Sequence, residues 1–373
     1  METPARSATP ASGSPVPARA PNDPGVTVKG AVKWLRNNLF QDWLNGLVTI
    51  AIALLLAWQI PKALDWLLFS AVFEGSRRSD CVIDAACWIP VGDYFHYFVY
   101  GPYPADQQWR VNTAFILGLL AFPLLFSRKL PRGLVLGYAT LLPVALWLLL
   151  KGGGILKEMP STMFGGLMLT FFLGAIAMCL SLPVAILLAL GRRSKLPVVR
   201  WSCIAYIEFI RAVPLLTFIF MASLMLQIFL PEGANVDKLL RILAVMIFVS
   251  AAYKAEILRG AIEALPKGQF EASQAMGCGY WKTIIHVVMP QVLRNSVPAL
   301  ISNFIGLFKE TTLVTIVGIL ELVGVVRAAF REPEWIGLDT EAHLVVSMVF
   351  FAVCFSIAQY GAFLERGIAS SRH

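Results

Sequence analysis

Charged side chains occur inside long apolar stretches in the second half of this sequence, where they are energetically expensive. They are Glu208, Arg211, Lys254, Glu256, Lys309 and Glu310. A charge placed in hydrocarbon is costly unless it pairs with another group or lines a water-filled path. These residues therefore mark either ion pairs that hold helices together or a polar route through an apolar protein.

The spacing of these charged residues indicates which partners their side chains can reach. Glu208 and Arg211 are three residues apart, so on a helix they can form a local ion pair. Lys309 and Glu310 are adjacent, so their side chains point in different directions and need different partners. Polar residues here could contact a zwitterionic substrate or form a gate, whereas pairing between helices or snorkelling to a polar surface is the structural alternative. The candidate path or gate residues are Arg211, Asn303, Lys309, Glu310 and Thr311.

Other kinds of chemistry lack the residues that they need. The four histidines are scattered and the six cysteines have no paired CxxC spacing, so no metal site is predicted. Neither GxSxG nor HExxH occurs, which argues against an intramembrane enzyme. The dipeptide Gly-Lys is absent, so the sequence has no GxxxxGK[ST] phosphate loop. The sequence thus predicts a protein that is not an enzyme and carries no cofactor of its own.

The segments around these residues are too apolar for a soluble protein. Hydrophobic residues make up 57% of the 373 residues and charged residues 14%, whereas soluble domains have roughly 45–50% and 25%. Membrane lipid must therefore cover much of the surface. The net charge of +8 comes from short basic clusters between apolar runs, which is typical of membrane proteins and argues against nucleic acid as a partner.

Crossing a bilayer takes about 20 mostly apolar helical residues, and eight segments meet this requirement. They lie near residues 44–60, 111–127, 134–150, 163–190, 203–230, 239–258, 297–320 and 342–363. We therefore expect an all-α polytopic membrane protein with eight transmembrane helices.

Lys and Arg concentrate in alternate connections between these segments. They precede the first span, follow the second and the fourth, lie between the sixth and seventh, and close the chain. The opposite loops mix both signs of charge. The positive-inside rule then predicts that the N-terminus and the C-terminus are both cytosolic.

Composition divides the chain into three parts. Residues 1–40 begin with a Pro-, Ala- and Ser-rich stretch without the apolar core of a signal peptide, and we expect a disordered cytosolic tail. Residues 41–155 are predicted to be a three-helix membrane extension that contains an external loop at 73–110. Residues 156–373 hold most intramembrane charges and are predicted to be a five-helix core with a cytosolic loop at about 260–295.

Cys81 and Cys87 share the loop 73–110. On the external side of the membrane they could form a short disulfide. Two unpaired thiols are the alternative, and the sequence leaves both open.

The segment after the sixth span has an unusual helical pattern for a loop. Gln269–Met276 predicts a short helix, Gly277-Cys278-Gly279 interrupts it, and Tyr280–Val288 predicts a second helix that Pro290 stops. An apolar stripe on the second helix consists of Trp281, Ile284, Ile285 and Val288. Such helices at the inner membrane face can rest on lipid, pack on the bundle or dock a partner, and periodicity alone does not choose.

This segment resembles the EAA loop of ABC importer permeases, whose pattern is EAA, three residues, Gly, nine residues, then I-x-L-P. The sequence has Glu271-Ala272-Ser273, then Gly277 at the right spacing, then Val287-x-Met289-Pro290, with mild departures at Ser273, Val287 and Met289. The flanks resemble the polar-amino-acid branch of that family. They read GGLMLT at Gly165, YIEFIRAVPLL at Tyr206, AAYKAEILRGAIEALPKGQ at Ala251 and KETTLV at Lys309. The resemblance covers about residues 160–366.

The resemblance implies the channel-forming permease subunit of an ATP-driven amino acid importer in a bacterial inner membrane. Its loop would form a coupling helix that enters a groove on a separate ATPase. The implied coupling residues are Glu271, Ala272, Ser273, Gly277 and Pro290, although Gly277 could simply cap a helix and Glu271 could be a solvated charge. The implied partners are a pair of ATPase subunits that bind ATP and Mg²⁺, a second and non-identical permease, and a periplasmic or extracellular solute-binding protein.

A secondary, ion-coupled amino acid transporter or a channel is the alternative, since neither needs an ATPase. Such folds often have paired repeats with broken helices near the membrane midplane. No second copy of the pattern at residues 251–310 occurs in the sequence, which counts against this alternative.

Overall fold

The computed structural model describes residues 28–82, 84–125, 132–154, 156–229, 231, 233 and 236–369. Within these residues the regular elements are all helical, and no strand forms. The all-α prediction is therefore confirmed. The chain separates into two units with a boundary after Ser70.

The first unit contains two α-helices and a π-helical turn. They are α1 (Val28–Leu39), α2 (Trp43–Leu64) and η1 (Asp65–Phe69). Residues 28–39 lie inside the predicted disordered tail and form α1, whereas residues 1–27 of that tail lie outside the described residues. No residue of α2 is buried within this unit, as expected for an apolar helix that faces lipid.

The second unit contains the remaining helices. The α-helices are α3 (Ile89–Tyr100), α4 (Gln108–Leu125), α5 (Arg132–Lys151), α6 (Gly166–Arg192), α7 (Pro197–Ala212), α8 (Leu215–Phe220), α9 (Leu226–Phe229), α10 (Lys238–Glu263), α11 (Gly268–Ala275), α12 (Tyr280–Lys282), α13 (Met289–Glu310), α14 (Leu322–Ala329) and α15 (Thr340–Ala369). Short 3-10 or π segments are η2 (Arg78–Asp80), η3 (Ala105–Gln107), η4 (Ser161–Met163), η5 (Met221–Met225), η6 (Thr283–Val288) and η7 (Thr311–Val317).

Each predicted span falls largely on helical residues. By length and hydropathy, four of the described helices can cross a membrane, namely Trp43–Phe69, Gly166–Arg192, Tyr280–Val317 and Thr340–Gly367. A bent pair, Pro197–Ala212 with Leu215–Phe229, adds a fifth if it is one span. The count of eight transmembrane helices therefore stays a prediction.

The segment predicted as a single span at 203–230 is broken. Helices α7 and α8–α9 meet at an angle of 100°. Pro214 explains the break, because a proline disfavours helical geometry in the residue before it. Accordingly, Val213 is extended, with φ −103° and ψ 134°. The prediction of one continuous helix here was wrong.

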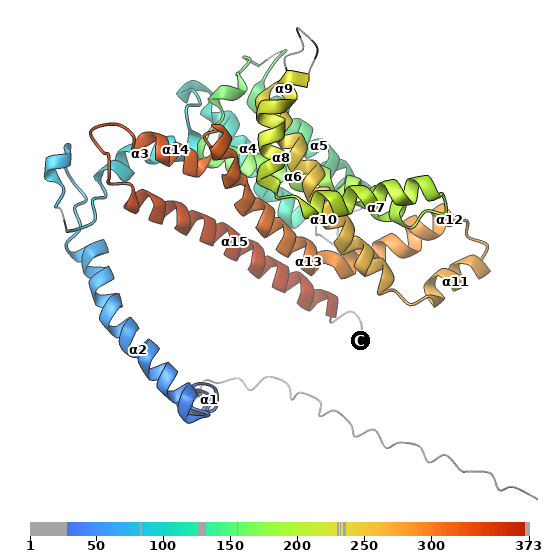
Figure 1. Ribbon diagram of the computed structural model, residues 1–373, viewed down its shortest axis with the longest axis horizontal. Helices are drawn as coiled ribbons and strands as arrows, with labels where there is room; N and C mark the ends of the chain where they lie inside the picture. The colour runs from blue at the N-terminus through green and yellow to red at the C-terminus, as the bar shows by residue number, and fades with distance from the viewer. Residues whose placement is uncertain are drawn as a thin grey trace, which may run out of the picture. The chain divides into compact units, whose positions relative to one another are not determined.

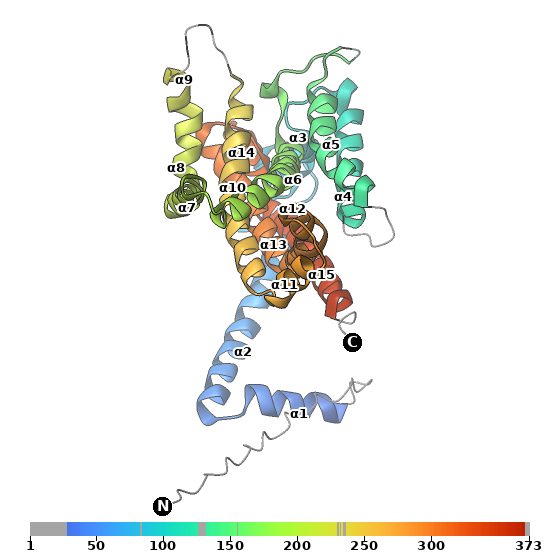
Figure 2. The same cartoon turned by 90° about the vertical axis from the view of Figure 1, so that its right-hand side faces the viewer.

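The centre of the second unit is the pair α6 and α10, which make the most extensive helix contact. Helices α4 and α5 pack on each other and on α6 (Figure 2). These two helices belong to the predicted N-terminal extension, yet they share a compact unit with the core. The second unit therefore extends across residues 155/156, and the predicted division there stays a prediction.

Gly166, in the GGLMLT motif, lies where three segments meet. Its N–H donates to the Leu320 carbonyl at 2.9 Å. Its φ is +63°, and a Cβ at this position would lie 2.5 Å from the carbonyl oxygen of Phe98 in α3. Only glycine combines this backbone conformation with such a close approach. The motif therefore fixes the start of α6 against α3 and the segment before α14.

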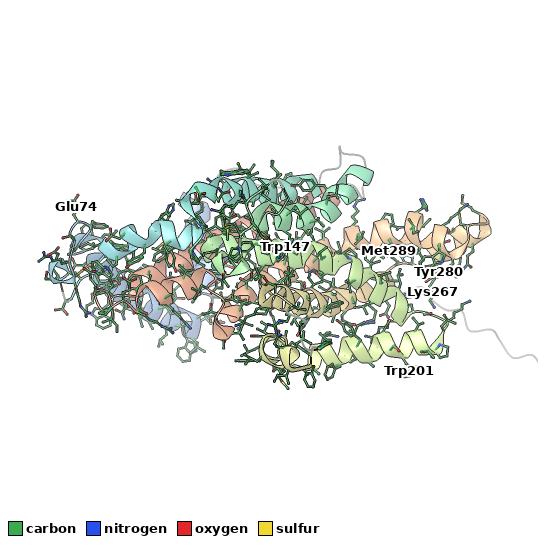
Figure 3. The ribbon with its side chains drawn as sticks, turned by 90° about the horizontal axis from the view of Figure 1, so that it is seen from above. Glu74, Trp147, Trp201, Lys267, Tyr280 and Met289 are labelled. Carbon is green, nitrogen blue, oxygen red and sulfur yellow. A yellow bond between two sulfur atoms is a disulfide. The ribbon has the colours of Figure 1, made fainter. Side chains whose placement is uncertain are left out.

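Two groups of helices lie at opposite ends of the second unit. Helices α3 and α14 lie at one end, and α11 and α12 lie at the other (Figure 1). In Figure 3, Glu74 marks the first end, and Lys267 and Tyr280 mark the second.

Candidate functional site

Helix α11 is a short surface helix whose end is set by glycine. Gly277 has φ +74° and follows Met276, the residue that caps the helix. The Gly277 N–H donates to the Gln274 carbonyl at 2.9 Å, and the Cys278 N–H donates to the Ser273 carbonyl at 3.1 Å. These bonds satisfy the last carbonyls of the helix in a left-handed turn that favours glycine. Gly277 therefore turns the chain back toward α12.

The three residues of the EAA-like motif have different environments on α11. Glu271 and Ala272 are exposed, whereas Ser273 is buried. The hydroxyls of Ser273 and Thr283 share a hydrogen bond at 2.8 Å. The Glu271 carboxylate has no ion pair or hydrogen bond to a side chain within the described residues. The structure thus presents Glu271 and Ala272 outward and uses Ser273 to hold α11 on η6.

The apolar stripe predicted on the second helix divides into two sides. Ile284 and Val288 are buried in a cluster with residues of α6, α7 and α10. Trp281 and Ile285 are exposed, as are the neighbouring Met276 and Tyr280. This exposed apolar surface lies next to the outward face of α11 and could receive a partner.

Pro290 does not stop the second helix, contrary to the prediction. Residues 280–310 form α12, η6 and α13 without a break, and Pro290 lies in the first turn of α13. The π-helical η6 precedes it, and the wider π turn accommodates a proline that lacks an N–H. Pro290 is half-buried rather than part of the outward face.

A cavity of about 290 Å³ lies among α8, α10 and α13. Of the predicted path residues, Asn303 and Glu310 line it, together with Ser250 and Tyr253 of α10. The Asn303 Oδ1 is buried and has no hydrogen-bond partner within the described residues. A buried acceptor without a donor is destabilising unless a ligand or water supplies one. The cavity is therefore a polar site inside an otherwise apolar bundle.

The other predicted path residues do not line this cavity. Lys309 is exposed, and Thr311 is buried with its hydroxyl donating to the Phe308 carbonyl at 2.7 Å. Arg211 belongs to a separate cluster of charged groups. The structure therefore brings only Asn303 and Glu310 together.

Arg211 takes part in an ion-pair cluster that joins α6, α7 and α10. Its guanidinium lies 3.7 Å from Glu256 and 3.9 Å from Glu208. Arg192 of α6 bridges the same two carboxylates, at 2.9 Å from Glu208 and 3.3 Å from Glu256. Arg259 lies 2.6 Å from Glu256. The local pair expected from spacing is present, but it is one contact in a cluster that links three helices.

Lys254 has a role that spacing alone did not reveal. Its side chain is fully buried, and its ammonium donates to the hydroxyls of Ser181 and Ser250 at 2.6 Å each. Ser250 also lines the cavity. The four-residue spacing of Ser250 and Lys254 can be found in the sequence, whereas the contact with Ser181 depends on the packing of α6 on α10.

The opposite end of this unit is held by cross-links and hydrogen bonds. Cys81 and Cys87, whose pairing the sequence left open, form a disulfide. The buried Cys87 N–H donates to Glu341 Oε1 at 2.9 Å. The Tyr94 hydroxyl of α3 donates to Glu332 at 2.6 Å, and this hydrogen bond raises the pKa of Tyr94 to about 12. These contacts tie the Cys81–Cys87 loop to the first turn of α15, and α3 to the segment after α14.

Comparison with known proteins places these features in a family. Residues 181–369 match the family described as binding-protein-dependent transport system inner membrane component. The chain is 41% identical over 345 residues to the inner membrane amino-acid ABC transporter permease protein YhdY of Escherichia coli K12, covering 92% of this chain and 94% of that protein. The chain belongs to this family of transport system inner membrane components.

The chain is also similar to a second permease and to a solved structure. It is 35% identical over 418 aligned positions to the glutamate/glutamine/aspartate/asparagine transport system permease protein BztC of Rhodobacter capsulatus, covering 93% of this chain and 96% of that protein. A solved amino acid ABC transporter with histidines is 26% identical, with a TM-score of 0.49, and covers 54% of this chain and 91% of that chain.

The family match includes several of the features described above. Residues 181–369 contain α11, the cavity residues of α10 and α13, and the ion-pair cluster. The resemblance inferred from the EAA-like segment is thus confirmed, and the inner membrane component is a multi-pass membrane protein. The family gives no support to the ion-coupled alternative.

Proposed function

We propose that this chain is the channel-forming permease subunit of an ATP-driven importer of amino acids. The observation that carries the proposal is the 41% identity over 92% of the chain to an amino-acid ABC transporter permease. The second relative is the permease of a system for glutamate, glutamine, aspartate and asparagine. An amino acid is therefore the substrate class that we infer.

The proposed contact with the ATPase is made by α11 and the exposed apolar side chains beside it. Glu271 is exposed and free to pair with a basic group of the partner, and Ala272 keeps the outward face of the helix thin. Gly277 sets the turn after the helix, while Ser273 and Pro290 hold the segment in place from the inside. Movement of a docked ATPase would reach the bundle through η6 and α13, which continue from α12.

The proposed substrate path includes the cavity of Asn303 and Glu310. An amide oxygen and a carboxylate can both accept hydrogen bonds from the ammonium group of an amino acid. Lys309 and Thr311 do not line this cavity, and we propose them only as candidates for the path beyond it, next to Glu310 in the chain. Arg211 is proposed as a gate residue, because separation of α7 from α10 must break its contact with Glu256.

The proposed assembly has both termini and α11 on the cytosolic side of a bacterial inner membrane. A pair of ATPase subunits that bind ATP and Mg²⁺ would dock there. A second, non-identical permease would complete the channel, and a solute-binding protein would deliver the substrate at the end that carries α3 and α14.

Uptake by the purified complex in proteoliposomes tests this function. Labelled amino acids are supplied with the binding protein on one side and ATP on the ATPase side, and ATP is omitted or an ion gradient is substituted in parallel. We expect uptake only with ATP, and competition by unlabelled amino acids. Uptake that needs a gradient but no ATP would overturn the proposal.

A further inference from the structure

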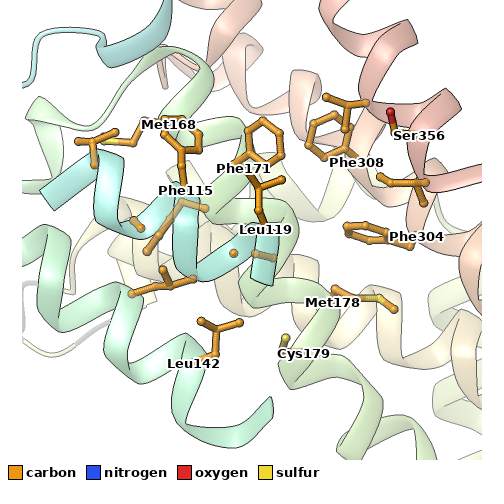
Figure 4. Close-up of a pocket in the computed structure, with 18 of the residues that line it drawn as sticks. Phe115, Leu119, Leu142, Met168, Phe171, Met178, Cys179, Phe304, Phe308 and Ser356 are labelled. Atoms are coloured by element: carbon orange, nitrogen blue, oxygen red, sulfur yellow. The ribbon is translucent and has the colours of Figure 1, made fainter. Parts of the chain in front are cut away.

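A second and larger cavity shares helix α13 with the cavity of the proposed path. It has a volume of about 430 Å³ and lies among α4, α5, α6, α13 and α15 (Figure 4). Aromatic and aliphatic side chains from different helices face it, including Phe115 of α4, Leu142 of α5, and Phe304 and Phe308 of α13. It is therefore built jointly by the N-terminal helices and the family core.

The side chains that line the cavity exclude an amino acid as its ligand. Among the residues that the structure describes, no charged side chain and no amide side chain lines this cavity. Its serine, Ser356, already donates its hydroxyl to the Ala352 carbonyl at 2.7 Å. The described lining offers no counter-charge to the ammonium or the carboxylate of an amino acid, and apolar cavities also stay free of water. The occupant must itself be apolar.

The surroundings of the cavity indicate the source of that occupant. The cavity is not fully enclosed, and large apolar side chains on its helices are exposed, with Leu119 and Leu141 each at 66% and Phe351 at 69%. In a membrane protein such surfaces are covered by lipid tails. The opening is therefore continuous with hydrocarbon and not with water.

We propose that this cavity, called the groove below, binds an acyl chain of a membrane phospholipid between the α4–α5 pair and the core. The bound chain replaces the protein contacts that are missing between these helices, so α4 and α5 pack on α6 through lipid as well as directly. The proposal requires only that the chain lies in a bilayer, and it is independent of the transported substrate.

Two glycine positions, one in the groove and one outside it, give a test variant and a matched control. Gly118 of α4 lines the groove, and a Cβ built there meets no atom within 4 Å. Gly118→Phe therefore fills the groove without a backbone clash. Gly137 of α5 also has no atom within 4 Å of an added Cβ but does not line the groove, so Gly137→Phe is the control. Ala352→Leu fills the groove from α15 and serves as a second variant if Gly118→Phe does not fold.

The test uses the assembled complex in nanodiscs with a phosphatidylethanolamine that carries a photoreactive diazirine near the end of one acyl chain. After irradiation, mass spectrometry maps the labelled peptides. We expect labels on groove residues of α4, α6 and α13, loss of these labels in Gly118→Phe or Ala352→Leu, and retention in Gly137→Phe. Labels on the exposed Leu141 face should persist in every variant.

Three results would overturn the proposal. The groove peptides could stay unlabelled in the native complex, they could keep their labels in the filled variants, or they could cross-link to a protein helix instead.

Discussion

Glu271, Ala272 and Ser273 are consecutive residues of α11 with separate tasks. The first two face outward and offer a surface to a partner, whereas the Ser273 hydroxyl bonds Thr283 inside the protein. The sequence pattern located the motif but treated its three positions alike. Serine can stand where the family pattern has alanine because the adjacent helix supplies a hydroxyl partner.

The Ser273–Thr283 hydrogen bond gives a prediction about stability. Ser273→Ala leaves the buried Thr283 hydroxyl without this partner, and we expect it to lower the free energy of unfolding by about 1 kcal/mol. Thr283→Val combined with Ser273→Ala should cost less than the sum of the two single changes. Denaturant unfolding of the four proteins in detergent measures this coupling, and strictly additive effects would show that the bond contributes nothing.

Asn303 gives a prediction in which stability and transport change differently. Its Oδ1 is buried without a partner, so Asn303→Leu should not lower the apparent melting temperature. If the oxygen accepts a hydrogen bond from a charged substrate group, its loss costs about 1.5–3 kcal/mol, or roughly 10- to 100-fold in uptake at low substrate concentration. Initial uptake rates in proteoliposomes measure the effect. Normal uptake by a folded Asn303→Leu protein would remove this residue from the path.

At the scale of single elements, backbone geometry decides how α11 is presented. Gly277 and Gly279 are two residues apart, and an added Cβ at either would meet no atom within 4 Å. They differ in backbone conformation, since φ is +74° at Gly277 and −67° at Gly279. This difference makes them a matched pair.

We expect Gly277→Ala to strain the turn by about 1–2 kcal/mol, since a Cβ is disfavoured in the left-handed conformation. Gly279→Ala should have little effect. Hydrogen–deuterium exchange of residues 268–290, together with ATP-driven uptake, measures both variants. The expected result is faster exchange and slower uptake for Gly277→Ala alone, and equal behaviour of the two variants would contradict the role of this turn.

The contact between α3 and the segment after α14 predicts a dependence on alkaline pH. The hydrogen bond from Tyr94 to Glu332 raises the Tyr94 pKa from 10.0 to about 12. A raised tyrosine pKa means that the stabilisation is fully present below pH 10 and is lost as the pH rises through about 12. Tyrosinate absorbance of the native protein minus that of Tyr94→Phe should show one late-titrating group. If the absorbance difference instead titrates with a midpoint at the ordinary tyrosine pKa, the hydrogen bond is ruled out.

Across the whole molecule, the sequence could predict the helical class, the apolar segments and the family motif, because these depend on local composition and spacing. The break of 100° between α7 and α8 was missed, although the residue that causes it, Pro214, can be read from the sequence. The sequence could not predict the contact of Lys254 with Ser181, or the meeting of Asn303 with α10 residues, because these depend on how distant helices pack. Pro290 misled the prediction because a π-helical turn accommodates it.

The most direct test of the central claim is charge reversal on the outward face of α11. Glu271→Lys is compared with Glu365→Lys, an equal change at an exposed position of α15. The measurements are the amount of ATPase subunit that co-purifies with the folded permease and the rate of ATP-driven amino acid uptake. The account predicts that Glu271→Lys loses both and that Glu365→Lys keeps both. Full ATPase binding and uptake by Glu271→Lys would contradict the role of α11 as the point of contact with the ATPase.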